Sequence, residues 1–176
     1  MISGDSSALG PDTRVIVVMG VSGSGKSAVG EALARALQWQ FFDADDFHPP
    51  HNVRKMAAGI PLDDADRAPW LERLNAVLRH AVARGGCAVL ACSALRQRYR
   101  DALRDRVPNL AFVHLAGEFA LIEKRLAQRQ HRYMPSSLLR SQFEALEPPL
   151  DAAVVDIAAP PDQIVAALIA RLHASG

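Results

Sequence analysis

Three features are scarce in this 176-residue chain, and each absence narrows the class of protein. The first is cysteine: only Cys87 and Cys92 are present, both in the strand-like run CAVLACS. Because side chains alternate along a strand, a spacing of five residues puts the two thiols on opposite faces, and we expect no disulfide between them. Free cysteines of this kind pack as small apolar residues, and a reducing, cytoplasmic setting fits them.

Long apolar runs and net charge are also lacking. No stretch has the roughly 18 consecutive apolar residues that a membrane-spanning helix needs. The start, MISGDSSALGPDT, has no apolar core, so we interpret residues 1–12 as a loose tail rather than a signal peptide. The formal net charge is only +1, which argues against nucleic acid as the main partner. We therefore expect neither a membrane nor a nucleic acid partner.

Short apolar runs such as VIVVM and AVLA alternate with longer amphipathic segments. This alternation predicts an α/β fold with a parallel sheet covered on both faces, and the length suits one domain over residues 13–176. Strands are expected at 14–19, 40–43, 88–92, 110–115 and 153–157. Helices are expected at 26–37, 50–58, 68–83, 94–106, 119–130, 137–146 and 162–174.

The stretch GVSGSGKS joins the first expected strand to the first expected helix and matches the pattern G-x-x-x-x-G-K-[ST]. Its glycines let backbone amides turn inward, which makes a cradle for phosphate at the helix N-terminus. Lys26 would reach the β- and γ-phosphates, and the Ser27 hydroxyl would ligate Mg²⁺. A plain glycine-rich turn is the alternative. The residues predicted to bind ATP are Gly20, Val21, Ser22, Gly23, Ser24, Gly25, Lys26 and Ser27.

The N-K-x-D and D-x-x-G motifs of a GTPase are absent from the chain. Large motor ATPases and transporters need longer chains or partner subunits. The combination of a phosphate loop and a short chain therefore favours a small phosphotransferase.

An acidic cluster, Asp43, Asp45 and Asp46, follows the second expected strand. In a doubly wound sheet the C-terminal ends of the strands form the ligand crevice, so these carboxylates should lie near the phosphates. The strand at 88–92 has no terminal aspartate, which leaves Asp43 as the best metal ligand. Asp45 would orient the acceptor hydroxyl and take its proton. A solvated acidic turn that caps the next helix is the alternative.

Three polar residues after this cluster, His48, Asn52 and Lys55, are spaced i, i+4 and i+7. On a helix they share one face, which would suit a polyhydroxylated anion, although a solvated face is the alternative. Asp64 or Asp66 is expected to cap the helix that follows.

Arg96 and Arg100 follow the third expected strand at an i, i+4 spacing. With Tyr99 they would hold a carboxylate of the acceptor. Ordinary surface pairing with Asp101 and Asp105 is an equally weighted alternative.

A second arginine pair, Arg125 and Arg129, is also spaced i, i+4 and is followed by a break at Pro135. Helix, break and helix over about residues 125–140 is the arrangement of a mobile lid. Lid arginines would neutralise charge on the phosphoryl group during transfer. A basic helical surface is the alternative.

These motifs together resemble the small P-loop gluconokinases, which are ATP:D-gluconate 6-phosphotransferases. The similarity runs from Val15 to the C-terminal helix and rests on four sequence blocks, which are given below. The block at residues 43–71 is the most specific, because other P-loop kinases lack it. Tyr133 stands where the family usually has phenylalanine. The four blocks are MGVSGSGKS (19–27), DADDFHPPHNVRKMAAGIPLDDADRAPWL (43–71), CSALRQRYRDALR (92–104) and MPSSLLRSQFEALEPP (134–149).

The resemblance implies a P-loop NTPase fold of the nucleoside- and shikimate-kinase-like type: three layers, a five-stranded parallel sheet, a helical lid and often a homodimer. It implies phosphorylation of D-gluconate to 6-phospho-D-gluconate, with gluconate between residues 43–55 and the helix after Cys92. More distantly, the strand ending FxDxD resembles shikimate kinases, where the first aspartate serves the metal and the second the substrate. Two alternatives stay open: a kinase of another hydroxylated acceptor such as shikimate or another sugar acid, or an ATP-sensing module without transfer.

Overall fold

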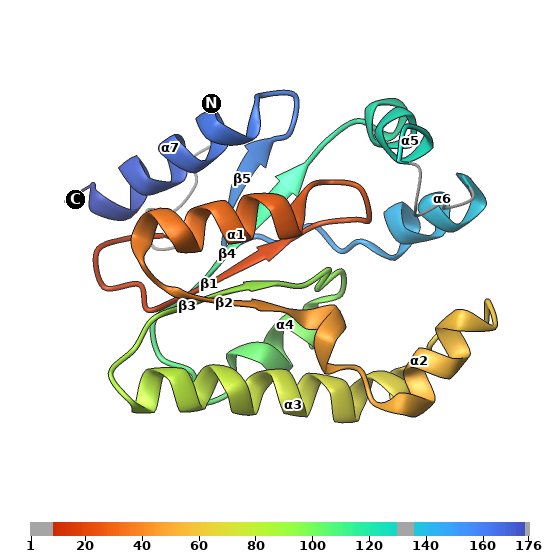
Figure 1. Ribbon diagram of the computed structural model, residues 1–176, viewed down its shortest axis with the longest axis horizontal. Helices are drawn as coiled ribbons and strands as arrows, with labels where there is room; N and C mark the ends of the chain where they lie inside the picture. The colour runs from red at the N-terminus through yellow and green to blue at the C-terminus, as the bar shows by residue number, and fades with distance from the viewer. Residues whose placement is uncertain (1–8, 130–135, 175–176) are drawn as a thin grey trace.

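A parallel five-stranded sheet forms the middle of the molecule, with strand order β2-β3-β1-β4-β5 (Figure 1). The computed structural model describes residues 9–129 and 136–174. The strands are β1 (Val15–Met19), β2 (Gln40–Asp43), β3 (Ala88–Ala91), β4 (Leu110–Ala116) and β5 (Ala152–Asp156). The helices are α1 (Lys26–Leu37), α2 (Pro50–Ala57), α3 (Asp64–Ala83), α4 (Gln97–Arg104), α5 (Phe119–Ala127), α6 (Ser136–Ala145) and α7 (Pro161–His173), with a 3₁₀ helix η1 (Ala44–Phe47) after β2.

The central strand β1 is buried along its whole length, which explains its unbroken apolar sequence VIVVM. Its side chains alternate between two cores. Ile16 and Val18 pack into the core under α1 and α7, whereas Val17 faces the core under α3 and α4. Figure 1 shows α1 and α7 on one side of the sheet and α3 and α4 on the other. The prediction of a three-layer α/β fold with a five-stranded parallel sheet is confirmed.

Two helix starts differ from the sequence prediction by more than one residue. Helix α3 begins at Asp64 rather than at 68, because Asp63 and Asp66 form a reciprocal capping box that starts the helix ahead of Pro69. The N-cap residue is therefore Asp63 rather than Asp64 or Asp66. The predicted capping role of Asp66 is confirmed in part, because its side chain accepts a hydrogen bond from the Asp63 amide at 3.0 Å. Helix α4 begins three residues later than the predicted residue 94, because Ala94 adopts a left-handed conformation with φ 45°.

Several smaller expectations can be compared directly with the structure. Cys87 and Cys92 are both free thiols. No helix within residues 9–129 and 136–174 has the length and hydropathy to cross a bilayer. Leu9, in the segment interpreted as a loose tail, is buried in the core under α1 and α7, so the packed part of the chain reaches at least to this residue.

The order in which strands are added to the sheet changes side at β1, although all strands run parallel. After β1 the chain runs through α1 to β2 on one edge, whereas β4 and β5 occupy the other side. In open α/β sheets such a switch point, at the carboxyl ends of the strands, is where ligands bind. Helices α2, α5 and α6 lie beyond this end of the sheet in Figure 1.

Candidate active site

The loop at residues 20–27 has the backbone shape of an anion cradle. Gly20 has φ 150°, and a Cβ there would lie 2.7 Å from Oγ of Ser24 and 2.9 Å from the main-chain oxygen of Leu115. A larger residue would therefore distort the turn. Gly25, the N-cap of α1, has φ 94° and no atom within 4 Å of a notional Cβ. This side of the loop is open for close approach of a ligand to the backbone.

The Lys26 side chain folds back across the phosphate loop toward Val21. Its Nζ donates a hydrogen bond to the main-chain oxygen of Val21 at 3.0 Å. Burial lowers the pKa of the Lys26 ammonium, the nearby carboxylates Asp45 and Asp43 oppose that shift, and Arg129 adds a smaller lowering effect. A lysine ammonium at the glycine-rich turn before a helix suits a bound phosphate.

Ser27 and Asp43 meet as the sequence predicts, because α1 begins beside the carboxyl end of β2. The Ser27 hydroxyl donates to Oδ2 of Asp43 at 2.7 Å, and the Asp45 amide donates to Oδ1 at 3.0 Å. A hydroxyl and a carboxylate are the oxygen ligands that Mg²⁺ uses in nucleotide sites, so the pair fits this ion. The described parts of the chain contain no group of three or more His, Cys, Asp or Glu residues that could hold a metal ion by themselves. Further ligands would have to come from phosphate and water.

Asp45 and His48 lie three residues apart on the acceptor side. The Asp45 side chain is 68% exposed, whereas that of His48 is 5% exposed, and Nε2 of His48 lies 4.0 Å from Oδ1 of Asp45. The imidazole stacks on Trp70 with ring centroids 4.3 Å apart. Burial lowers the pKa of His48, Asp45 opposes this shift and Arg67 adds to it. The result is a neutral ring held next to an open carboxylate.

Asn52 and Lys55 point toward α3 rather than into solvent. Asn52 is 1% exposed, and its Nδ2 donates to the main-chain oxygen of Asp66 at 2.9 Å. Nζ of Lys55 lies 2.6 Å from Oδ2 of Asp66, and Nε2 of His51 lies 3.2 Å from Oδ1. The Lys55 hydrogen bond holds the pKa of the Asp66 carboxyl well below its usual range and raises that of Lys55. The sequence reasoning missed Asp66 as the hub of this cluster.

The structure does not bring Arg96 and Arg100 together as a carboxylate clamp. Arg96 is the N-cap of α4, with Nη1 3.8 Å from Oε1 of Glu147. Arg100 is 1% exposed, because α4 turns its side chain inward. Its guanidinium donates to the main-chain oxygens of Ala94, Leu95 and Glu147 and to Oε1 of Gln97.

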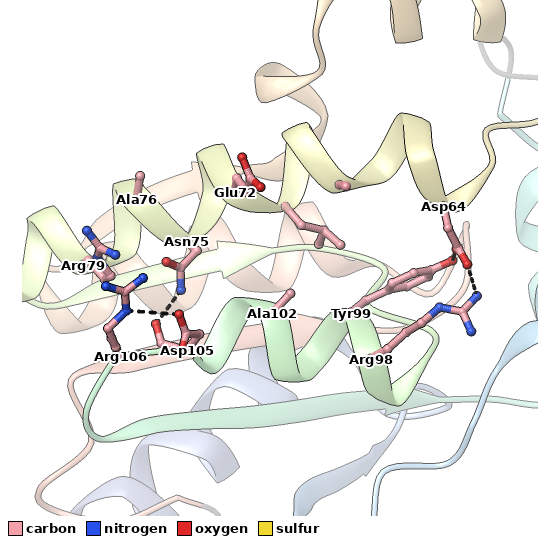
Figure 2. Close-up of a pocket in the computed structure, with 12 residues that line it drawn as sticks. Asp64, Glu72, Asn75, Ala76, Arg79, Arg98, Tyr99, Ala102, Asp105 and Arg106 are labelled. Carbon is pink, nitrogen blue, oxygen red and sulfur yellow. Dashed lines mark hydrogen bonds and ion pairs between the residues drawn. The ribbon is translucent and has the colours of Figure 1, made fainter.

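The Tyr99 hydroxyl also has a partner away from the acceptor side. It donates to Asp64 at 2.7 Å, at one end of a cavity of about 630 Å³ between α3 and α4 (Figure 2). No residue of the phosphate loop lines this cavity, which is separate from the candidate site. Its lining residues are Asp64, Ala68, Leu71, Glu72, Asn75, Ala76, Arg79, Arg98, Tyr99, Ala102, Asp105 and Arg106.

The two expected lid arginines differ in their surroundings. Nη2 of Arg125 donates to the main-chain oxygen of Ile157 at 2.7 Å, which ties α5 to the end of β5. Arg129 is exposed just after α5, close enough to Lys26 to affect its pKa. The middle of the expected lid, residues 130–135, lies outside the described residues.

One contact of the phosphate loop was not foreseen from the sequence. Oε1 of Gln142 in α6 accepts from the Ser22 amide at 2.7 Å, and Nε2 of Gln142 donates to the Ser22 hydroxyl at 3.1 Å. The two residues are 120 positions apart, so no local spacing could have indicated the pair. Ser24 is 2% exposed, and its Oγ is a buried oxygen without a hydrogen-bond partner in the described structure.

The fold and the loop at its switch point define the class of a P-loop kinase. A family model described as "AAA domain" matches residues 15–149. The thermoresistant gluconokinase of Escherichia coli is 44% identical over 162 residues, covering 90% of this chain and 93% of that protein. The gluconokinase of Gluconobacter oxydans is 48% identical over 143 residues, covering 81% and 80%.

A solved structure agrees with these sequence relatives. The crystal structure of a gluconokinase from Sinorhizobium meliloti superposes with a TM-score of 0.80 at 46% identity, and the match covers 93% of each chain. At this level of identity and coverage the chain belongs to the gluconokinase family.

Proposed function

We propose that this protein transfers the γ-phosphoryl group of ATP to the 6-hydroxyl of D-gluconate. The observation that carries the proposal is the 2.7 Å hydrogen bond between Ser27 and Asp43, which joins the phosphate loop to the acidic end of β2. Asp45 follows two residues later with an exposed carboxylate. The sequence relatives named gluconokinase support gluconate as the acceptor.

The donor half of the reaction uses the loop and α1. The inward amides and the N-terminus of α1 bind the phosphates of ATP, and Lys26 exchanges its hydrogen bond with Val21 for one with a phosphate oxygen. Ser27 and Asp43 would hold Mg²⁺, which supplies neutralisation of the phosphate charge when it is bound.

The transfer step uses Asp45. Its carboxylate accepts a hydrogen bond from the 6-hydroxyl and takes the proton as that oxygen forms its bond to the γ-phosphorus. The bond from the γ-phosphorus to the bridging oxygen breaks, and ADP leaves. Lys26 and Arg129 neutralise charge on the transferred group, and Arg125 braces α5 through Ile157.

The acceptor is held by residues of the α2 and α4 ends of the site. His48 and Arg96 are the proposed direct contacts of gluconate. Asn52, Lys55 and Arg100, which the sequence also indicated, support the site from behind because their polar groups already bond to protein atoms. Closure of the segment around residues 125–140 over the site would exclude water and so prevent hydrolysis of ATP. The homodimer implied by the family resemblance and the cytoplasmic setting inferred from the two free cysteines stay predictions.

The test is acceptor-dependent release of ADP from Mg-ATP with gluconate, shikimate, glycerate, glucose and AMP as acceptors. A response to gluconate far above the others is expected. A response to a different acceptor keeps the donor half of the proposal and overturns the acceptor. Binding of ATP with silence across the whole panel favours an ATP-sensing module.

A further inference from the structure

The amide of Asn52 can be oriented from its neighbours. One end of the side chain lies 2.9 Å from the main-chain oxygen of Asp66 and 3.3 Å from Nδ1 of His48. A carbonyl oxygen only accepts hydrogen bonds, so the amide nitrogen must face it. That nitrogen has two hydrogens, and the second is directed at Nδ1 of His48.

The protonation of His48 follows from this orientation. Because Nδ1 accepts a hydrogen bond, a neutral imidazole must carry its hydrogen on Nε2. Two charged groups, Asp45 and Arg67, influence the ring, but burial has the largest effect and lowers the pKa of His48. Stacking on Trp70 holds the plane of the ring, and Trp70 is itself fixed by a 2.7 Å bond from Nε1 to the main-chain oxygen of Ala44.

The far side of the ring is left with a free donor. Nε2 lies 4.0 Å from Oδ1 of Asp45, which is longer than a hydrogen bond, and among the described residues the only side-chain hydrogen bond of the ring is made by Nδ1. An oxygen placed beside both groups would accept from Nε2–H of His48. If that oxygen belongs to a hydroxyl, it would also donate to the Asp45 carboxylate.

We propose that Asn52 is a positioning residue that holds His48 as the Nε2–H tautomer, and that His48 donates this hydrogen to an oxygen of the acceptor beside Asp45. This inference rests on the proposed function for the identity of the acceptor, but not for the tautomer. We call the hydrogen-bonded series Asp66, Asn52 and His48 the relay. The relay is rigid because Asp66, whose main-chain oxygen accepts from Asn52, is held at the start of α3 by the capping box with Asp63.

The relay also predicts a selectivity. A donor at Nε2 favours an acceptor with a hydroxyl or carboxylate oxygen at this position. An analogue lacking that oxygen leaves a desolvated N–H without a partner, which should lower kcat/KM by at least about tenfold.

The tautomer can be measured without ATP or gluconate. Long-range ¹H–¹⁵N correlation spectra of protein labelled with ¹⁵N-histidine distinguish the two neutral forms, and the His48 signals are assigned by their loss in His48→Gln. The expected wild-type result is the Nε2–H form. The Nδ1–H form would overturn the proposal even if gluconate is phosphorylated. The Nε2–H form in a protein that prefers another acceptor overturns only the proposed function.

Asn52→Asp tests the role of the amide. A carboxylate cannot donate, so Nδ1 of His48 should take the hydrogen and the pKa of His48 should rise. Then kcat/KM for gluconate should fall at least about tenfold while KM for ATP changes less than about twofold. The matched control is Asn75→Asp, because Asn75 is also buried and donates to main-chain oxygens, those of Leu103 and Asp105. An unchanged tautomer in Asn52→Asp would contradict the assignment, and the wild-type spectrum decides if that variant does not fold.

Discussion

Gln142 of α6 makes two hydrogen bonds with Ser22 of the phosphate loop, one to the amide and one to the hydroxyl, at 2.7 and 3.1 Å. Helix α6, which begins within the expected lid, is therefore in direct contact with the phosphate loop. Beyond the sheet, α6 lies next to α5, whose residue Glu123 accepts a hydrogen bond from Ser136 (Figure 1). The position of α6 and the shape of the phosphate loop are therefore linked through the hydrogen bonds between Gln142 and Ser22.

Gln142→Ala should weaken ATP binding more than it slows transfer. Loss of hydrogen bonds worth about 1 kcal/mol in total corresponds to a roughly fivefold rise in KM for ATP, with kcat changed less than about twofold. Steady-state kinetics with varied ATP measure both. Gln163→Ala on the exposed face of α7 is the control and should leave both constants unchanged. A fall in kcat alone would mean that Gln142 acts on transfer and not on the loop.

Asp45→Asn should lower kcat by at least about 100-fold, because the amide cannot take the proton of the acceptor hydroxyl. KM for ATP should change little. Asp46→Asn is the matched control, since Asp46 is an exposed neighbour in the same 3₁₀ helix. Rapid-quench measurement of the first turnover separates the transfer step from product release. Wild-type turnover in Asp45→Asn would remove the proposed base from the mechanism.

His114 gives the stability a pH dependence. It is buried in β4 and lines a small cavity of about 60 Å³ together with Val21 and Phe143. Burial lowers its pKa in the folded protein, and nearby Arg100 adds to this effect, so the unfolded chain binds the proton more readily. The free energy of unfolding should fall as pH drops below about 6.5, by at most about 1.4 kcal/mol per pH unit for one proton.

Urea unfolding between pH 7.5 and 5 measures this slope. His114→Gln should reduce the slope, leaving the contribution of His48, whose pKa is also lowered. His80→Gln is the control because His80 is exposed in the last turn of α3. Equal slopes in wild type and His114→Gln would show that protonation of His114 does not oppose folding.

Arg100→Met should destabilise the fold by about 3 kcal/mol, because several buried main-chain oxygens lose their donor. The guanidinium joins the loop after β3 to the segment after α6 at Glu147. Arg35→Met, which removes only an exposed pair with Glu31, should change stability by less than about 0.5 kcal/mol. Thermal unfolding of the two variants compares them. Similar melting temperatures would exclude a structural role for Arg100.

The features that the sequence predicts well depend on neighbouring residues. The strand, glycine turn and helix around 14–37 are consecutive, and their pattern identifies the loop directly. The contact between Ser27 and Asp43 follows from one topological rule, that parallel strands end at the same edge of the sheet.

The features that the sequence does not predict depend on distant partners. Arg96 and Arg100 have the spacing of a surface pair, but tertiary packing rotates Arg100 into the interior, where main-chain oxygens replace the expected carboxylate. Gln142 has no local signal for its contact with Ser22. The sequence predicts helix α3 from residue 68, but the capping box of Asp63 and Asp66 starts it at Asp64.

The segment between residues 43 and 70 carries much of its own scaffold. Its hydrogen bonds from Asn52 and Lys55 to Asp66, and from Trp70 to Ala44, begin and end inside the segment. Such a self-supporting unit can change its sequence while the loop that handles the nucleotide stays the same. Descendants of one ancestral kinase can therefore diverge in acceptor by rewriting this single stretch, and a transplant of the whole stretch is the natural unit for redesigning acceptor choice.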